Sequence, residues 1–384
     1  MSQLNLYSIF LFSLLVSQIL DISQSQSLPD FCHPYDKKVL LKIKNKLGNP
    51  PSLMSWDPKT DCASWKDVQC GNNEGHVTSV SIIDALDVHG PIPPYFDHLY
   101  WLTSLNFINV PNLSGPIPSY FGSLTNLTAF FVSGTKLTGP IPGFLNRLTK
   151  LTQLDLSSNK LTGPIPNFLS QLKGLSYLDL SSNGLTGPVP TALAQLINLS
   201  YLQLKSNKLS GPIPGFLAQL KNLNTIDFSS NYLTGPIPEY LGHKAGLTTL
   251  ALSNNLLIGP IPKSLGRSDL SMIKLSHNKL SGDASFLFDK ANINIISVEI
   301  DYNFFKFDFT NVDLNRRLVA FNVSHNFIYG SLPKRFGQMW VDSVDVSYNQ
   351  LCGPIPNGRR FKKVNLVVFS HNKCICGGPL PACK

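Results

Sequence analysis

Apolar residues recur along the chain at fixed intervals, with a constant period of 24 residues between Gly115 and Gly259. One unit reads Leu151-x-x-Leu154-x-Leu156-x-x-Asn159-x-Leu161 and runs on into the turn Gly163-Pro164-Ile165-Pro166. Length alone would suggest two or three domains, but a repeat of this kind predicts one elongated stack of coils. Twelve strand units begin near Val77, Leu102, Leu127, Leu151, Leu175, Leu199, Leu223, Leu247, Leu270, Ile295, Leu318 and Val341.

Alternation of apolar and polar residues within each unit predicts a short strand. Leu154 and Leu156 are expected to point inward, while Gln153, Asp155 and Ser157 point outward. Asn159 and its equivalents are expected to form an inward ladder that bonds to backbone groups of the turns. The sequence therefore predicts an α/β repeat solenoid with a parallel, concave β-sheet whose outward side chains form the binding surface.

The two ends of the chain differ from the repeats. Residues 6–20 are an apolar run followed by small polar residues, so we expect a signal peptide at residues 1–27. No later segment holds 18 consecutive apolar residues, and we expect no membrane anchor. The cysteines cluster at both ends, at Cys32, Cys62 and Cys70 and then at Cys352, Cys374, Cys376 and Cys383. We expect an N-terminal cap at 28–76, repeats at 77–351 and a C-terminal cap at 352–384.

The repeat and the caps resemble a known family. The unit LxxLxLxxNxLxGxIPxxLxxLxx is similar to plant extracellular leucine-rich repeats, and residues 32–70 resemble their N-terminal cap. The run GDASFLF at 282–288 and the segments FNVSHNFIYGSLP and HNKCICGGPLPAC resemble polygalacturonase-inhibiting proteins. The resemblance implies a right-handed superhelix and a secreted protein of the plant cell wall. It also implies that the concave face binds a pectin-degrading endopolygalacturonase.

The resemblance also implies how the cysteines pair. The expected disulfides are Cys32–Cys62, Cys352–Cys374 and Cys376–Cys383, which leaves Cys70 unpaired. Members of the family have a second cysteine where this chain has Ala63, so a Cys62–Cys70 bond with a free Cys32 stays an alternative. The family also has fewer repeats than the twelve counted here, so a partner's footprint cannot be transferred whole.

Partner-binding candidates lie in the outward columns of the predicted sheet. Tyr177 and Tyr201, one coil apart, are the first candidates because aromatic residues dominate binding hot spots. The acidic residues of the central column are expected to be exposed, either as contacts for a basic partner or as a solvated face. The full set is Phe131, Gln153, Asp155, Tyr177, Asp179, Tyr201, Gln203, Thr225, Asp227 and Lys274.

The net charge of +9 favours a polyanionic partner, which in a secreted plant protein would be pectin and not nucleic acid. A solvated basic surface is the alternative. Candidate pectin-binding residues are Arg316, Arg317, Lys334, Arg335, Arg359, Arg360, Lys362 and Lys363. Candidate glycosylation sites in Asn-x-Ser/Thr sequons are Asn112, Asn126, Asn198 and Asn322.

No catalytic motif occurs in the sequence, and His277 and His325 fall at equivalent positions of different coils beside the asparagine ladder. We therefore expect a monomeric binding protein and no enzyme, with no cofactor and no metal. An inhibitor of a microbial pectinase is the leading hypothesis. A co-receptor module in signalling and an ice-binding solenoid are the alternatives, the latter because Thr162, Thr186, Ser210 and Thr234 recur regularly.

Overall fold

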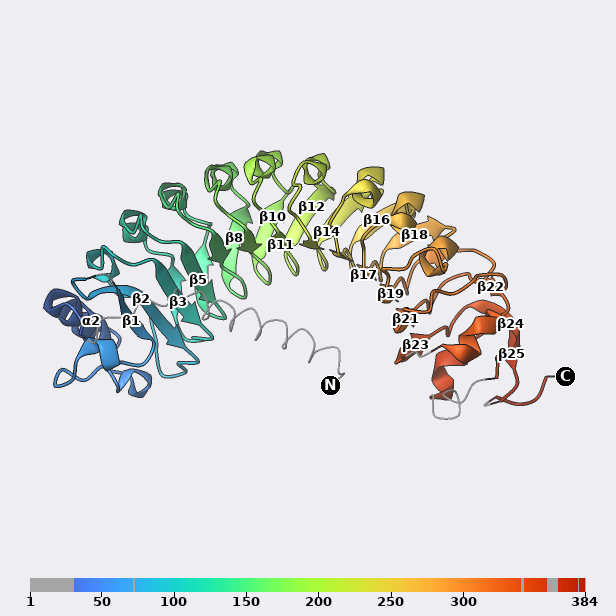
Figure 1. The fold of residues 1–384 in the computed structure, drawn as a ribbon, viewed down its shortest axis with the longest axis horizontal. Helices are drawn as coiled ribbons and strands as arrows, with labels where there is room; N and C mark the ends of the chain where they lie inside the picture. Colours follow the sequence, from blue (N-terminus) through green and yellow to red (C-terminus); the bar gives the residue numbers. More distant parts are fainter. Residues whose placement is uncertain (1–30, 72, 340–341, 358–364, 379, 384) are drawn as a thin grey trace.

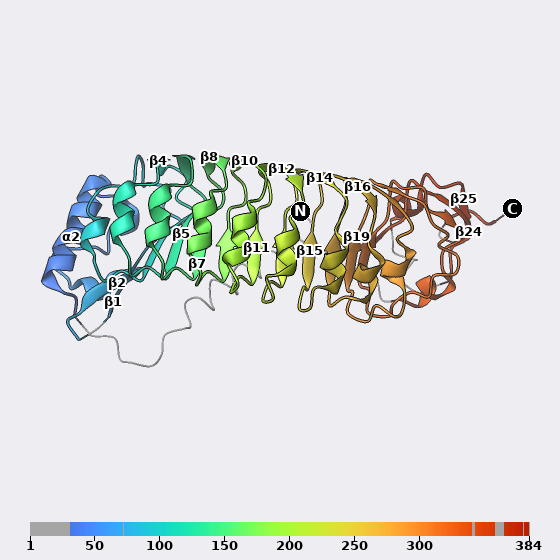
Figure 2. The same ribbon diagram turned by 90° about the horizontal axis from the view of Figure 1, so that it is seen from above.

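The computed structural model describes residues 31–71, 73–339, 342–357, 365–378 and 380–383, and the expected signal peptide lies outside them. These residues form one curved solenoid, with the N-terminal cap at one end of the arch and the C-terminal cap at the other (Figure 1). The parallel strands line the inside of the arch, and short helices line the outside (Figures 1 and 2). The predicted fold class is confirmed.

A thirteen-stranded sheet forms the concave face of the described residues. Its first strand pairs antiparallel with the second, and the twelve that follow are parallel, each bonded to the next coil. The strands are β1 (Val68–Gly71), β2 (His76–Ile83), β3 (Ser104–Ile108), β5 (Ala129–Ser133), β7 (Gln153–Asp155), β9 (Tyr177–Asp179), β11 (Tyr201–Gln203), β13 (Thr225–Asp227), β15 (Thr249–Ala251), β17 (Met272–Lys274), β19 (Ser297–Glu299), β21 (Ala320–Asn322) and β23 (Ser343–Asp345).

The leucine pattern forms the core as predicted. Leu154 pairs in register with Leu178 on the next coil, and Leu154, Leu156 and Leu178 are fully buried. A single coil cannot enclose these side chains, so each coil depends on its neighbours for its core.

A second sheet follows the turn after each concave strand. It is built by the Asn-x-Leu-x-Gly-Pro segments, where glycines such as Gly163 take a φ of 81° that side chains rarely adopt. Its strands are β4 (Ser114–Pro116), β6 (Lys136–Gly139), β8 (Lys160–Pro164), β10 (Gly184–Gly187), β12 (Lys208–Pro212), β14 (Tyr232–Gly235), β16 (Leu256–Pro260), β18 (Lys279–Gly282) and β20 (Phe304–Phe305). Three further strands, β22 (Tyr329–Gly330), β24 (Gln350–Pro354) and β25 (Cys374–Cys376), form a small sheet towards the C-terminus.

Short 3₁₀-helices occupy the convex side. Most begin directly after a proline of the Gly-Pro-Ile-Pro turn, which takes the N-cap position with an extended backbone, as Pro166 does. These helices are Phe96–His98, Ser119–Ser123, Gly143–Arg147, Asn167–Gln171, Thr191–Gln195, Gly215–Ala218, Glu239–His243, Lys263–Arg267, Ser285–Phe288 and Lys334–Gln338.

The asparagine ladder has the predicted role. Asn183 donates from Nδ2 to the carbonyl of Leu156 at 2.9 Å and to that of Leu180 at 3.2 Å, and its Oδ1 accepts the Leu161 N–H at 3.0 Å. Asn207, Asn231 and Asn255 repeat this pattern on the following coils. The ladder therefore satisfies backbone groups that the tight turn leaves without partners.

Disulfide-linked caps cover both ends of the core. The N-terminal cap contains helix α2 (Pro34–Lys46), which packs against the 3₁₀-helix Phe96–His98. It also contains the 3₁₀-helices Pro51–Leu53 and Cys62–Ser64, and Trp56 stacks on Trp65. The bonds are Cys32–Cys62, Cys352–Cys374 and Cys376–Cys383, the pairs that the resemblance implies, and Cys70 is a buried free thiol. The C-terminal cap includes the 3₁₀-helix Leu366–Phe369. Within the described residues, no helix combines the length and apolar character needed to cross a bilayer.

Candidate protein-binding surface

An aromatic cluster lies at the centre of the concave sheet. The rings of Tyr177 on β9 and Tyr201 on β11 stack with centroids 4.6 Å apart and planes 4° apart. Phe131 on β5 contacts Tyr177 edge-on at 6.5 Å. Direct strand register at a separation of about 4.8 Å places these rings side by side.

The central acidic column is not exposed, contrary to our expectation. Asp155 and Asp179 point away from the leucine core but are only 5% and 4% exposed, and Asp227 is half-buried. Each carboxylate turns back to accept the backbone N–H of the serine two residues on, at 2.8 Å for Asp155 and Asp179. Short carboxylates beside large rings are covered by those rings when neighbouring coils are this close.

Phe131, predicted among the outward binding residues of the sheet, is also buried, contrary to that prediction. It is 6% exposed, and its ring is enclosed between neighbouring coils against Tyr177. Tyr177 and Tyr201 themselves are half-buried, so their edges are what a partner would meet.

Burial changes the ionisation of this cluster. Removal from water, together with the nearby Asp155, raises the pKa of Asp179 to about 7, and burial raises the pKa of Asp155 as well. The pKa of Tyr177 and that of Tyr201 are raised mainly by burial and then by the neighbouring carboxylates. The patch consequently carries less negative charge near neutral pH than its sequence suggests.

The other predicted concave residues are partly exposed on the same face. The Tyr201 hydroxyl donates to Gln203 Oε1, which fixes both side chains. Lys274 forms an ion pair with Glu299 at 3.2 Å. Gln153 and Thr225 occupy the same column as Tyr177.

The predicted basic cluster is only partly described. Arg316, Arg317 and Lys334 are exposed, while the Arg335 guanidinium bonds to Asp313 at 2.6 Å. Lys290 shares that carboxylate at 2.8 Å, so Asp313 balances only one of the two positive charges beside it. The remaining four candidates, Arg359, Arg360, Lys362 and Lys363, lie outside the described residues.

The four sequon asparagines differ in their surroundings. Asn112, Asn126 and Asn198 each donate from the side-chain amide to a backbone carbonyl of the preceding coil, at 2.9–3.0 Å. Asn322 lies on concave strand β21 and accepts the Ser324 N–H at 3.0 Å. A glycan on Asn322 would therefore stand on the concave face.

A cluster of titratable groups also exists in the N-terminal cap. Asp36 is buried and accepts the Val77 N–H at 2.8 Å, and it lies 3.0 Å from His76 Nδ1. His76 Nε2 lies 3.2 Å from Glu74, and the His33 ring stacks on His76 at 4.2 Å. Asp36 thus joins helix α2 to strand β2. Ligand atoms of His33, Asp36 and His76, one from each, lie within 4.8 Å of one another, close enough for the three to hold a metal ion.

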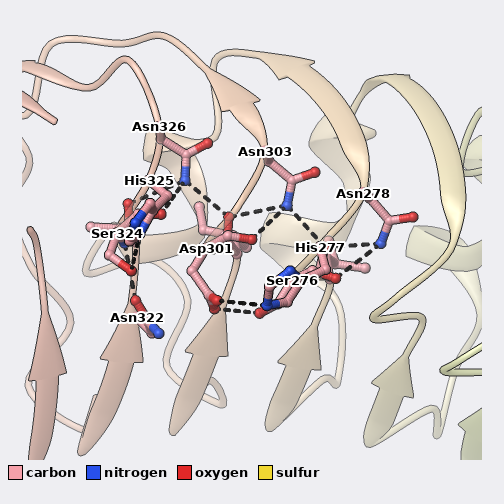
Figure 3. A network of polar contacts seen from close by, with 12 residues as sticks. Ser276, His277, Asn278, Asp301, Asn303, Asn322, Ser324, His325 and Asn326 are labelled. Carbon is pink, nitrogen blue, oxygen red and sulfur yellow. Dashed lines mark hydrogen bonds and ion pairs between the residues drawn. The ribbon is translucent and has the colours of Figure 1, made fainter. Parts of the chain in front are cut away.

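One set of surface residues was not selected from the sequence. His277 and His325, noted beside the asparagine ladder, belong to a continuous column with Tyr302, Tyr348 and His371. Figure 3 shows His277 and His325 beside the polar contacts of Ser276, Asp301 and the ladder asparagines. The signal was available, because each of the five immediately precedes a ladder asparagine.

Known proteins resemble this chain, one of them over nearly its whole length. Models described as leucine rich repeat match residues 125–185, 198–220, 222–243 and 246–268, and a leucine rich repeat N-terminal domain matches 33–71. Polygalacturonase inhibitor 2 of Arabidopsis thaliana is 46% identical over 376 residues, which cover 97% of this chain and 98% of the relative. A polygalacturonase inhibitor of Vitis vinifera is 38% identical over 116 residues, 30% of this chain and 34% of that relative.

Two solved structures extend this similarity. A plant ice-binding protein superposes with a TM-score of 0.56 at 34% identity, covering 92% of this chain and 98% of that one. The ectodomain of the Arabidopsis receptor kinase HAESA, in complex with an IDA peptide hormone ligand, has a TM-score of 0.58 at 25% identity, covering 89% and 74%.

Proposed function

Because this chain belongs to the polygalacturonase inhibitor family of leucine-rich-repeat proteins, we propose that it binds and inhibits secreted endopolygalacturonases through its concave face. The observation that carries the proposal is identity of 46% over nearly the full length of both chains, in a fold that exposes one long continuous sheet. Inhibition would follow from docking over or near the cleft of the enzyme, with no reaction of the inhibitor itself.

The stacked pair Tyr177 and Tyr201 is the proposed centre of this surface. Their mutual stacking and the Tyr201–Gln203 hydrogen bond restrict both side chains before a partner arrives. Binding then costs little side-chain entropy, and tyrosine offers both apolar area and a polar tip. Phe131 contacts Tyr177 edge-on, and the Tyr177 hydroxyl donates to Asp179 Oδ2 at 3.5 Å.

We also propose that the protein is a monomer without catalytic activity, secreted to the plant cell wall. The exposed Arg316, Arg317 and Lys334 and the net charge of +9 support weak retention on pectin. If retention is electrostatic, salt should elute the protein from wall material. Incubation of the pure protein with polygalacturonate alone should release no reducing ends, and release would contradict the non-enzymatic proposal.

The decisive experiment is an inhibition assay of the mature chain against a panel of microbial and insect endopolygalacturonases. We expect concentration-dependent inhibition of at least one enzyme and direct binding to the same enzyme. Lack of inhibition and of binding across the panel, with specific capture of a receptor kinase ectodomain instead, would favour the co-receptor alternative.

A second candidate function rests on the second sheet. Thr138, Thr162, Thr186, Ser210 and Thr234 are exposed there, one per coil, and the plant ice-binding protein covers almost the same length. Exposed lysines, among them Lys136, Lys160 and Lys208, interrupt this array. A measurement of thermal hysteresis tests the candidate, and absence of hysteresis at high protein concentration removes it.

A further inference from the structure

Two histidines and a carboxylate come together in the N-terminal cap, at one end of the arch (Figure 1). We call His33, Asp36 and His76 the cap triad. His33 is the N-cap residue of helix α2, Asp36 lies in the first turn of that helix, and His76 begins strand β2. No spacing motif in the sequence indicates the triad, since Asp36 and His76 are 40 residues apart.

The donor atoms of the cap triad are those that transition metals prefer. Imidazole nitrogen binds Zn²⁺, Cu²⁺ and Ni²⁺, and a carboxylate often completes such a site. Ca²⁺ and Mg²⁺ are bound by sets of oxygen atoms, so two imidazoles argue against them. Ligand atoms about 2.1 Å from one ion, at angles of about 90–110°, are about 3.0–3.4 Å apart. Asp36 Oδ2 and His76 Nδ1 lie 3.0 Å apart, so the separation that one ion needs is already present.

The contacts around the triad also match those of a metal site. His76 Nε2 lies 3.2 Å from Glu74, while Nδ1 of the same ring faces Asp36. A metal-binding histidine typically donates its other ring N–H to a carboxylate in this way, which fixes the tautomer and the ring orientation. The Val77 N–H donates to Asp36 Oδ2 at 2.8 Å and holds the carboxylate in place.

Ring packing holds the two histidines together before an ion arrives. The His33 N–H donates to the Gly75 carbonyl at 2.8 Å, which joins the two segments that carry the triad. The His33 ring stacks on His76 with centroids 4.2 Å apart, and Trp101 stacks on His76 at 5.5 Å. Ligands that are already positioned lose little conformational freedom on binding, which favours affinity.

Burial of Asp36 gives a reason for a cation at this place. Asp36 is 3% exposed, and a buried carboxylate requires a positive or hydrogen-bonding partner. His33 and His76 are partly exposed, so an ion can reach the triad from solvent. An ion pair between Asp36 and a protonated His76 would meet the same requirement, and the experiment below separates the two.

A group of three cysteines in the same cap is a weaker candidate. Among the residues that the structure describes, Cys32, Cys62 and Cys70 form the other group with ligand atoms this close. A disulfide joins Cys32 to Cys62, so the Cys70 thiol alone could bind an ion. One ligand does not make a site.

We propose that the cap triad binds one divalent transition-metal ion, with Zn²⁺ as the first choice. The triad supplies three ligands, and a water molecule completes a tetrahedral set. The ion ties helix α2 to strand β2 and so stabilises the cap that covers this end of the solenoid core. This proposal revises our expectation of no metal.

The test titrates Zn²⁺ into the untagged mature chain, after treatment with a chelator and removal of the chelator. Calorimetry, and elemental analysis after dialysis, count the bound ions. The variants are His33→Asn, which keeps a good N-cap residue, and Asp36→Asn, which keeps an acceptor for the Val77 N–H. The matched control is His243→Asn, because His243 lies 3.6 Å from Glu239 in an exposed histidine–carboxylate pair outside the cap.

We expect one Zn²⁺ per chain in the parent and in His243→Asn. Each triad variant should bind Zn²⁺ at least tenfold more weakly, because loss of even an outer partner of a metal ligand typically weakens binding about 10–100-fold. Zn²⁺ should also raise the melting temperature of the parent more than that of His33→Asn. Co²⁺ as a second probe should give the visible absorption of a four-coordinate site.

Absence of Zn²⁺ binding by the parent would leave an ion pair only and overturn the proposal. Equal binding by the parent and the triad variants would overturn it too. Loss of binding in His277→Asn with retention in His33→Asn would place the ion beside Asp301, which lies 3.8 Å from His277. If Asp36→Asn fails to fold by circular dichroism, His33→Asn decides alone, since it leaves the contact between Asp36 and His76 intact.

The proposal is independent of enzyme inhibition. His33→Asn leaves the stacked Tyr177 and Tyr201 unchanged on strands β9 and β11, so it should inhibit polygalacturonase as the parent does. A folded variant with intact inhibition and weakened Zn²⁺ binding supports the cap triad specifically.

Discussion

Asp155 and Asp179 lie in direct register on adjacent strands, and each accepts the N–H of the serine two residues on at 2.8 Å. Two buried carboxyl groups this close cannot both ionise cheaply, since burial penalises each charge and the charges repel. The pair therefore keeps protons that exposed carboxyl groups would release, and the centre of the concave face responds to pH.

This relationship predicts that stability falls with rising pH. Asp179 has a pKa of about 7 in the folded chain against an ordinary 3.8, so the folded state retains a proton that the unfolded chain loses between these values. We expect Asp179→Asn to be more stable than the parent by about 1–4 kcal/mol at pH 7.5, with little difference at pH 4. Asn322 already makes the equivalent bond, to Ser324. Urea unfolding at both pH values measures the difference.

A variant with the opposite expected change in stability serves as the control. The Thr310 side chain and backbone donate to Asp308 and hold the pKa of that exposed carboxyl below its usual value. Asp308→Asn should therefore be slightly less stable than the parent at pH 7.5. If Asp179→Asn also proves less stable there, the protonated pair is ruled out.

Removal of the stacked tyrosines should weaken enzyme binding. Thr225 and Thr249 occupy the same column on the next coils, so Tyr177→Thr/Tyr201→Thr is compatible with the fold. We expect the binding free energy for an inhibited polygalacturonase to weaken by about 2 kcal/mol or more, because replacement of an aromatic hot-spot residue typically has an effect of this size. Surface plasmon resonance measures it, with Tyr232→Thr as control. Unchanged affinity would mean that the enzyme contacts another part of the chain.

Replacement of a ladder asparagine should destabilise the fold more than replacement of an exposed asparagine. Asn207 is buried and bonds four backbone groups, including the carbonyls of Leu180 and Leu204. Asn207→Ala leaves these groups unpaired, and we expect about 2–4 kcal/mol of destabilisation. The exposed Asn222 makes one bond, to the Ile197 carbonyl, so Asn222→Ala should cost under about 1 kcal/mol. Thermal and urea unfolding compare the two variants. Equal losses of stability would contradict the stabilising role of the ladder.

The free thiol should be chemically silent in the folded chain. Cys70 is buried, and burial raises its pKa to about 12, so almost no thiolate exists at pH 8. We expect iodoacetamide at pH 8 to label the native protein negligibly and to add one label after denaturation without reduction. Mass spectrometry of the peptide containing Cys70 counts the labels. Rapid labelling of the native chain would mean that the cap opens.

Several features of this fold follow from sequence alone. The period of 24 residues predicted the coil, and the alternation at Leu154–Leu156 predicted which side chains enter the core, because strand geometry leaves only two faces. The position of Asn159 after the strand predicted the ladder, since a tight turn leaves backbone groups that a short amide can reach. The cysteine pairs came from resemblance and not from spacing.

Tertiary structure decided what the outward residues do. The sequence placed Phe131, Asp155 and Asp179 outside the core but gave no measure of their burial, which depends on how closely neighbouring rings cover them. The stacked rings of His277, Tyr302 and His325 can be found from their place before each ladder asparagine but not from the 24-residue period, because they are separated by 25 and then 23 residues. Stacking of coils brings these positions into one line, since each turn restores the backbone register whatever the length of the coil before it.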